Sequence, residues 1–136
     1  MRILVTGGLG IVGRSLTGQL RKRGHHVVCC DLYHQPDEIG FSVGTDIKNP
    51  LYARCDIGKF QQIERVFEKT GPFDFVYNCA AEFGRWNGED FYETLWQTNV
   101  IGTKNMIRLQ ERLGFCLIHF SSSEVYGDWP ELMTET

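Results

Sequence analysis

The sequence has no hydrophobic run long enough to cross a membrane and no excess of positive charge. A membrane-spanning helix needs at least about 18 consecutive apolar residues, and no run approaches that length. With 14 Lys and Arg against 17 Asp and Glu, the formal net charge is −3, which provides no basic surface for nucleic acid. No positively charged segment followed by an apolar one opens the chain. We therefore expect a cytoplasmic protein that binds neither membranes nor nucleic acid.

The sequence also has no CxxC pair and no spaced set of cysteine and histidine ligands. An odd number of cysteines within apolar stretches indicates reduced, buried thiols in a cytosolic protein. His119 interrupts an apolar run and is interpreted as the polar end of a strand. We expect no metal site. The cysteines are Cys29, Cys30, Cys55, Cys79 and Cys116.

Short apolar runs alternate with amphipathic segments along the 136 residues, which is the length of one domain. Continuous apolar strands between amphipathic helices indicate a parallel sheet that is covered on both faces. We therefore predict an α/β fold over residues 1–136, a doubly wound parallel sheet of the Rossmann type. The expected strands are 3–5, 26–31, 51–56, 73–81 and 115–120, and the expected helices are centred on 12–20 and 60–67, with a long one over 91–113.

The segment TGGLGIVG (6–13) lies between the first strand and the first helix. Gly7 permits a tight turn, Gly10 lets a pyrophosphate approach the backbone, and Gly13 lets the helix pack closely. The N-terminus of the helix then offers N–H groups to phosphates. We count Ile11 and Val12, between the second and third glycines, among the expected cofactor-binding positions.

An acidic residue, Asp31, ends the second strand, 18 residues after Gly13 (31 − 13 = 18). A carboxylate at this place can accept hydrogen bonds from both hydroxyls of an adenosine ribose, and it repels a 2′-phosphate. Together with the glycine turn it predicts NAD rather than NADP as the cofactor. The competing interpretation is a structural glycine loop beside an Asp that caps a turn.

Four further motifs follow in order, each after a strand or within the long helix. With GxxGxxG they make the chain resemble the extended short-chain dehydrogenase/reductases, the branch that holds NAD-dependent sugar-nucleotide epimerases, dehydratases and decarboxylases. The resemblance covers essentially the whole chain, and it is specific for the family but not for a substrate. The four motifs are Asp56-Ile57, Asn78-Cys79-Ala80-Ala81, Asn99-Val100-Ile101-Gly102-Thr103 and SSSEVYGD at 121–128.

The resemblance implies a role for each matching position. Asp56 and Ile57 would contact the adenine ring, and the small side chains of Ala80 and Ala81 would leave room along the cofactor. Asn99 would support the active site from the helix beneath it, and we count it among the expected cofactor-binding positions. All these positions lie at carboxyl ends of strands or on the adjoining helix, where an open α/β sheet binds its ligands.

For the serine run, the resemblance implies that Ser122 is the catalytic Ser/Thr, which hydrogen-bonds the sugar hydroxyl that is oxidised. Ser123 replaces the Asp of the dehydratases, so the run is closer to that of the decarboxylases. We include Ser123 and Glu124 with Ser122 as catalytic candidates. Glu124 is interpreted either as an acid/base group or as a solvent-facing residue. Without the resemblance, the three hydroxyls would be expected to satisfy local backbone groups.

The segment EFGRWNGED (82–90) follows Ala81 and does not resemble the corresponding loop of the decarboxylases. Arg85 could bind a phosphate or carboxylate, and Trp86 could stack on a substrate. Alternatively, both side chains cover the neighbouring helix.

The sequence lacks the family's catalytic Tyr with a Lys four residues later, in which the Tyr acts as the base. None of the five tyrosines has Lys at that spacing. Relatives carry the pair after the VYG turn, so we expect the Tyr-Lys helix, the last strands and the substrate-binding portion beyond Thr136. The chain alone is expected to be inactive.

Two functions remain open at this point. The first is the cofactor-binding part of an NAD-dependent sugar-nucleotide epimerase or dehydratase, which oxidises a sugar hydroxyl transiently to a ketone. The second is a non-catalytic NAD-binding sensor or scaffold. A second apolar stripe on the long helix, Trp96, Val100 and Ile107, matches the family's dimer interface, and we expect a homodimer through helix 91–113.

Overall fold

A computed structural model describes residues 1–33, 51–83 and 92–127. They contain a five-stranded, wholly parallel sheet with the order β3-β2-β1-β4-β5. The strand order reverses direction at β1, as in a doubly wound sheet, so the predicted α/β fold is confirmed. The strands are β1 (Arg2–Thr6), β2 (His26–Asp31), β3 (Tyr52–Arg54), β4 (Phe75–Asn78) and β5 (Cys116–His119).

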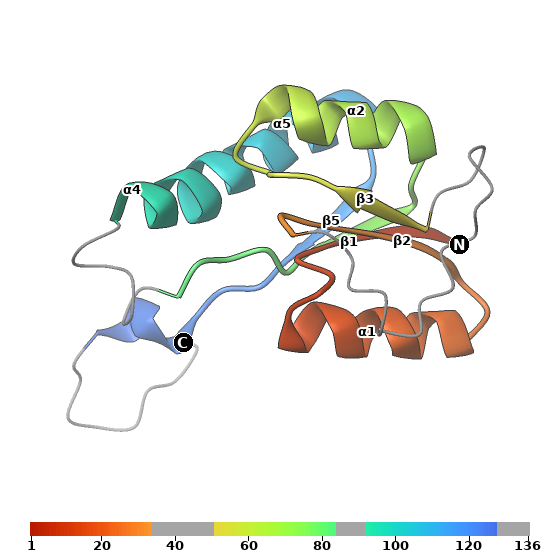
Figure 1. Ribbon diagram of the computed structural model, residues 1–136, viewed down its shortest axis with the longest axis horizontal. Coiled ribbons are helices and arrows are strands. Elements are labelled where there is room, and N and C mark those ends of the chain that lie inside the picture. The colour runs from red at the N-terminus through yellow and green to blue at the C-terminus, as the bar shows by residue number, and fades with distance from the viewer. Residues whose placement is uncertain (34–50, 84–91, 128–136) are drawn as a thin grey trace.

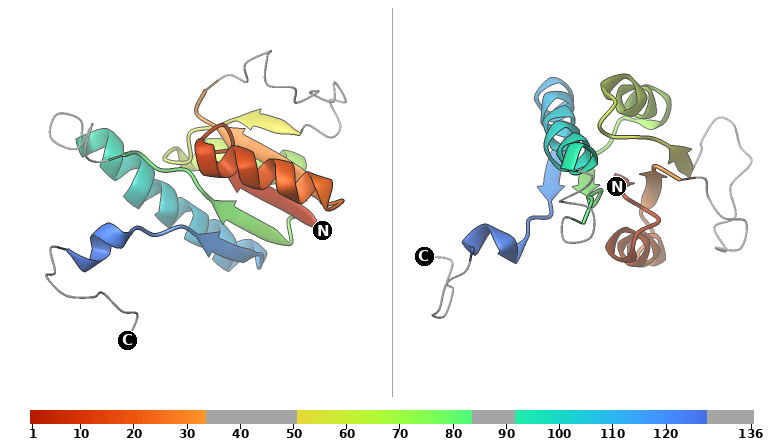
Figure 2. Two further views of the ribbon diagram at one scale, coloured as in Figure 1. Left: turned by 90° about the horizontal axis from the view of Figure 1, so that it is seen from below. Right: turned by 60° about the vertical axis from the view of Figure 1, so that its left-hand side comes forward.

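Helices cover both faces of the sheet (Figures 1 and 2). Helix α1 (Ile11–Lys22) lies on one face, and α2 (Phe60–Thr70) and α5 (Thr103–Leu113) lie side by side on the other. None of the helices in the described ranges is long and apolar enough to cross a bilayer.

The core has two parts, one on each face of the sheet, because successive residues of a strand point to opposite faces. Leu4 of β1 packs in the larger cluster with α2 and α5 residues such as Ile63 and Leu109. Ile3 and Val5 pack in the smaller cluster with Leu20 of α1. This two-sided burial explains why β1 is a continuous apolar run rather than an alternating one.

Three strands are shorter than predicted, and each loses residues at its carboxyl end. The predictions 51–56, 73–81 and 115–120 correspond to Tyr52–Arg54, Phe75–Asn78 and Cys116–His119. The residues after each strand leave the ladder and form loops at the carboxyl edge of the sheet. Most of the predicted site residues that the structure describes border cavities at this edge.

The predicted helix 91–113 is a run of three helical segments, and its first residue lies outside the described part of the chain. Helix α4 (Tyr92–Leu95) leads into a π-helix, η1 (Trp96–Gly102), which continues into α5. The wider π turn was not predicted, because three- and four-residue apolar steps do not distinguish it from an α-helix. Gly102, at the end of η1, packs so closely on Ile57 that an added Cβ would lie 2.6 Å from its Cδ1.

The five cysteines are free thiols, but they are not all buried as predicted. Cys29, Cys30 and Cys55 are buried, Cys79 is half-buried and Cys116 is exposed. Cys116 lies on β5, which is an edge strand with one neighbour in the described sheet. Within the described ranges, no three His, Cys, Asp or Glu side chains are grouped in a way that could hold a metal ion.

Candidate functional site

The glycine turn between β1 and α1 packs against the end of β4. Gly7 has a φ of +64°, and an added Cβ would lie 2.8 Å from the Ala80 backbone. At Gly13, an added Cβ would lie 2.2 Å from the Gly7 carbonyl oxygen, so the helix touches the turn. Gly10 is the N-cap of α1 and contributes no side-chain hydrogen bond to its first turn. The turn therefore leaves the N-terminus of α1 uncapped by a side chain, as an anion site requires.

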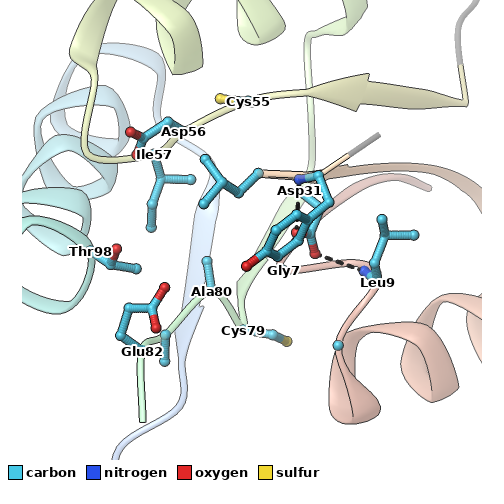
Figure 3. A pocket seen from close by; sticks show the side chains of 14 residues that line it. Gly7, Leu9, Asp31, Cys55, Asp56, Ile57, Cys79, Ala80, Glu82 and Thr98 are labelled. Atoms are coloured by element: carbon cyan, nitrogen blue, oxygen red, sulfur yellow. Dashed lines mark hydrogen bonds between the residues drawn. The ribbon is translucent and has the colours of Figure 1, made fainter. Parts of the chain in front are cut away.

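Asp31 braces this turn from the end of β2. Its Oδ2 accepts a hydrogen bond from the Leu9 N–H at 2.9 Å, shown as a dashed line in Figure 3. The carboxylate therefore fixes the turn in addition to bordering a cavity. This structural contact was not predicted from the sequence.

Asp56 and Ile57 lie in the loop that follows β3. The Asp56 Oδ1 accepts a hydrogen bond from the Gly58 N–H at 2.9 Å, and the Asp56 N–H donates to Gln62 Oε1. Ile57 is largely buried in the core under Gly102. The loop is thus held from α2 and from η1, which positions both predicted residues at the cavity.

The segment after β4, Cys79–Glu82, is held from two sides. The Ala80 N–H donates to Thr6 Oγ1 at 3.3 Å. The Asn99 side chain binds the Glu82 backbone twice: its Oδ1 accepts from the Glu82 N–H (2.8 Å) and its Nδ2 donates to the Glu82 carbonyl (3.0 Å). Asn99 therefore holds this loop and borders the second cavity rather than the first. Its supporting role in the active site stays a prediction.

A cavity of about 260 Å³, here called the first cavity, lies at the carboxyl edge of the sheet (Figure 3). Leu9 and Asp31 lie at one end of it, and Glu82 and Thr98 lie at the other. Predicted site residues that line it are Gly7, Gly10, Asp31, Asp56, Ile57, Ala80 and Ala81. The other lining residues are Leu9, Leu32, Tyr33, Cys55, Cys79, Glu82 and Thr98.

Four predicted cofactor-binding residues do not line the first cavity, namely Ile11, Val12, Gly13 and Asn99. Gly13 is buried against the turn, and Ile11 and Val12 are exposed, Ile11 to 94%. Of the unpredicted lining residues, several are sequence neighbours of predicted ones, and that adjacency could have identified them. Glu82, which directly follows Ala81, is one of these neighbours. Thr98 comes from η1, and only the folded arrangement brings that helix to the cavity.

A larger cavity of about 650 Å³, here called the second cavity, adjoins the first. The two share a wall, since Cys79, Ala80, Ala81 and Glu82 border both. The other residues of the second cavity are Asn78, Phe83, Leu95, Asn99, Thr103, His119, Phe120, Ser121, Ser122 and Val125. The catalytic candidate Ser122 therefore lies beside the segment that also borders the first cavity.

The other two catalytic candidates of the serine run are Ser123 and Glu124. Ser123 begins a short 3-10 helix, η2 (Ser123–Tyr126), and does not line the second cavity. The side chain of Glu124 lies outside what the structure describes, as do Arg85 and Trp86 of the loop after Phe83.

Burial controls the ionisation of two groups near the cavities. It raises the pKa of the Cys79 thiol to about 11, so this thiol is protonated at neutral pH. Burial, followed by the nearby Asp31 carboxylate, also raises the pKa of Tyr52, whose hydroxyl donates to the Tyr33 carbonyl oxygen. Neither group is therefore a base at neutral pH.

The chain matches the NAD dependent epimerase/dehydratase family over residues 3–136. It belongs to this family. The resemblance expected from the motifs is thereby confirmed, and it concerns a family of NAD-dependent enzymes.

Relatives of this epimerase/dehydratase family chain are found by sequence and by structure. It is 35% identical to "UDP-glucuronic acid decarboxylase 1" of Danio rerio, over 96% of the chain and 29% of that protein. It superposes on the UDP-glucose 4-epimerase of Thermus thermophilus, solved in complex with NAD, with a TM-score of 0.82 and 26% identity. The Stenotrophomonas maltophila UDP-glucose-4-epimerase, with bound NAD and formylated UDP-arabinopyranose, gives a TM-score of 0.77 and 26% identity.

The alignments cover almost all of this chain but less than half of each relative. They span 99% of the chain and 43% of the Thermus protein, and 96% and 40% for the Stenotrophomonas protein. The chain thus corresponds to about a third of the decarboxylase and to somewhat more of the epimerases.

Proposed function

We propose that this chain is the cofactor-binding part of an NAD-dependent enzyme that converts a nucleotide sugar by transient oxidation of a sugar hydroxyl to a ketone. The observation that carries the proposal is the shared wall of the two cavities. The glycine turn and Asp31 border one cavity, Ser122 borders the other, and residues 79–82 border both.

The residues of the first cavity fit a dinucleotide. Neither Gly7 nor Gly13 has room for a Cβ, whereas at Gly10 the single close contact of an added Cβ is the Gly7 carbonyl oxygen at 3.3 Å. Backbone can therefore approach a pyrophosphate at Gly10. Asp31 stands at the end of β2, where a carboxylate accepts hydrogen bonds from a ribose. We assign Asp56 and Ile57 to the adenine, and Ala80 and Ala81 to the cofactor's path toward the second cavity.

When bound, NAD supplies an acceptor for the hydride that leaves the sugar carbon. The task of this chain is then to hold the sugar hydroxyl beside the shared wall, and we assign that task to the Ser122 hydroxyl. Residues from beyond this chain would supply the base, as the family's Tyr-Lys pair does. Once a ketone has formed, protons on the neighbouring carbons become acidic enough for epimerisation or elimination.

The relatives suggest two nucleotide sugars to test. One relative is a UDP-glucuronic acid decarboxylase and two are UDP-glucose 4-epimerases. The sequence predicts epimerisation or dehydration, but its serine run, with Ser123 in place of the dehydratases' Asp, is closer to that of the decarboxylases. The Danio relative is such a decarboxylase, so decarboxylation is the third reaction to test after the same oxidation. UDP-glucose and UDP-glucuronic acid are therefore the first substrates to offer.

The test uses the full-length protein that contains this chain, with NAD and either sugar nucleotide, and separates the products by chromatography. The wild type is expected to convert at least one of them. Ser122→Ala is expected to lower kcat about a hundredfold, as for loss of a group that assists proton transfer, while NADH binding is unchanged. Ser15→Ala, on the exposed side of α1, is the matched control and should behave as the wild type.

The second candidate function, a non-catalytic NAD-binding module, makes the opposite prediction. Such a protein would bind NADH and return both sugar nucleotides unchanged. In the described part of the chain, the observation that favours it is the lack of a Tyr-Lys pair beside Ser122.

We also propose that the helix surface formed by Trp96, Val100 and Ile107 joins two copies of the protein. The three side chains are exposed to 57%, 40% and 45%. Large apolar side chains that share one helix face are expected to be covered by a partner.

A further inference from the structure

A row of three polar side chains crosses the sheet at the carboxyl ends of β1, β4 and β5. Thr6 is the register partner of Asn78, and Asn78 is the register partner of His119. Register partners in neighbouring strands direct their side chains to the same face of a sheet. We call these three residues the polar row.

The preceding row on this face is entirely apolar. It consists of Leu4, Val76 and Leu117, which are also register partners and pack in the larger core cluster. Core packing alone would be served by another apolar row. The change from apolar to polar side chains at the carboxyl edge therefore requires a further reason.

A chain of hydrogen bonds runs from Ala80 through the polar row to His119, and each group donates to the next. The Ala80 N–H donates to Thr6 Oγ1 at 3.3 Å, and the Thr6 hydroxyl donates to Asn78 Oδ1 at 2.6 Å. Since the amide oxygen faces Thr6, the Asn78 Nδ2 faces His119, 3.2 Å from its Nδ1. Thr6 and Asn78 are buried, so these groups rely on one another for hydrogen bonds.

The orientation of the Asn78 amide, with its oxygen toward Thr6, assigns the tautomer of His119. The Asn78 Nδ2 can only donate, so Nδ1 of the imidazole must accept and carries no proton. The proton of the neutral ring therefore lies on Nε2, on the far side of the ring from Asn78. Fixing one ring nitrogen through a hydrogen bond to the other is a common means of preparing a histidine for a task.

The protonated nitrogen, Nε2, belongs to a side chain that is exposed and lines the second cavity. His119 borders this cavity together with Ser121, Ser122 and the shared wall. Its inner nitrogen is bound to a buried amide, and its outer nitrogen carries a hydrogen-bond donor. A ligand in the cavity can meet this donor with an oxygen acceptor.

We propose that His119 is a substrate-contacting residue, whose Nε2–H donates a hydrogen bond to an oxygen of the sugar nucleotide in the second cavity. Thr6 and Asn78 are then positioning residues that act through the imidazole. This inference rests on the proposed function and adds to it a residue that determines how the substrate is held.

Two substitutions separate this role from a purely structural one. His119→Asn places an amide where Nδ1 stood and can keep the contact with Asn78, but it has no group at the position of Nε2. His119→Gln reaches the position of Nε2 with an N–H donor and abandons the contact with Asn78. A substrate contact predicts that Gln replaces His better, whereas a structural tie to Asn78 predicts that Asn does.

The experiment titrates UDP-glucuronic acid and UDP-glucose into the NADH-loaded full-length protein by calorimetry, so that no oxidation begins. His119→Asn is expected to weaken the binding of the preferred sugar nucleotide about tenfold, the scale of one neutral hydrogen bond. His119→Gln should stay within about threefold of the wild type on the same scale. The affinity for NADH should be unchanged in both variants.

The possible failures are distinguishable. If the wild type binds NADH but neither sugar nucleotide, the proposed function is overturned and the inference with it. If the wild type binds a sugar nucleotide and His119→Asn binds it equally well, the inference alone is overturned. A ¹⁵N spectrum of the imidazole ring provides a second test, because a proton on Nδ1 in place of Nε2 would also contradict the inference.

Discussion

At the scale of single residues, two glycines of α1 differ in how much space surrounds them. Gly13 lies at the start of α1, where an added Cβ would lie 2.2 Å from the Gly7 carbonyl oxygen. Gly18 lies in the middle of the same helix, and an added Cβ would meet nothing within 4 Å. The first glycine is required by packing, whereas the second is not.

We therefore predict opposite effects of the same substitution at these two positions. Gly13→Ala should destabilise the protein by about 1–3 kcal/mol, because the backbone of the turn must move to admit the methyl group. Gly18→Ala should stabilise it by about 0.5–1 kcal/mol through the higher helix propensity of alanine. Urea unfolding of the full-length protein measures both, and equal effects would contradict this account of the turn.

The two cysteines outside the buried group should differ in reactivity. Burial raises the pKa of Cys79 to about 11, whereas Cys116 is exposed. Since the thiolate is the reactive form, iodoacetamide at pH 8 should label Cys116 well before Cys79. Labelling of Cys79 should rise as the pH approaches its pKa, and NADH should slow it, because Cys79 lines the first cavity.

Peptide mass spectrometry of the labelled protein measures both rates. Faster labelling of Cys79 than of Cys116 at pH 8 would contradict the assigned burial. Unchanged labelling of Cys79 in the presence of NADH would contradict the assignment of the first cavity to the cofactor.

At the scale of elements, side chains of the π-helix η1 form hydrogen bonds to two loops of the site. Gln97 Nε2 donates to the Gly58 carbonyl at 2.7 Å, which holds the loop after β3. Asn99, two residues later, binds both backbone groups of Glu82 in the loop after β4. The π-helix, a form that often marks functional sites, thus carries the side chains that hold both loops in place.

We predict that each of these side chains protects its own loop. Asn99→Ala should speed hydrogen exchange of the Glu82 amide, because its acceptor is removed, and Gln97→Ala should leave that amide unchanged. Hydrogen exchange with mass spectrometry on the full-length protein resolves the two cases. Equal exchange at Glu82 in the wild type and Asn99→Ala would show that the loop does not depend on this contact.

The sequence predicted those parts of the fold and site that contiguous residues specify. Apolar runs located the five strands, and the glycine turn with Asp31 located most of one side of the first cavity. The π-helix, the position of Thr98 at the first cavity, and the polar row depend on contacts between residues distant in sequence. The ends of β3, β4 and β5 were predicted too late, because residues such as Ala80 and Ala81 continue an apolar pattern after leaving the ladder.

At the scale of the whole molecule, the exposed face of η1 and α5 leads to a prediction about assembly. The full-length protein should sediment as a dimer, and Trp96→Glu should convert it to a monomer by placing a charge in the apolar contact. Gln61→Glu, an equal change of charge on the exposed side of α2, should remain dimeric. Analytical ultracentrifugation measures all three, and a monomeric wild type would contradict the proposed interface.

The wall formed by residues 79–82 has a thermodynamic consequence for the molecule. Because the same four residues border both cavities, a displacement of the wall that favours a ligand in one cavity changes the space available in the other. The two binding equilibria are then linked, and the factor by which one ligand alters the affinity of the second must be the same in both directions. The hydrogen bond from the Ala80 N–H to Thr6 ties this wall to the sheet, and the two between Asn99 and Glu82 tie it to η1, so both oppose such a displacement.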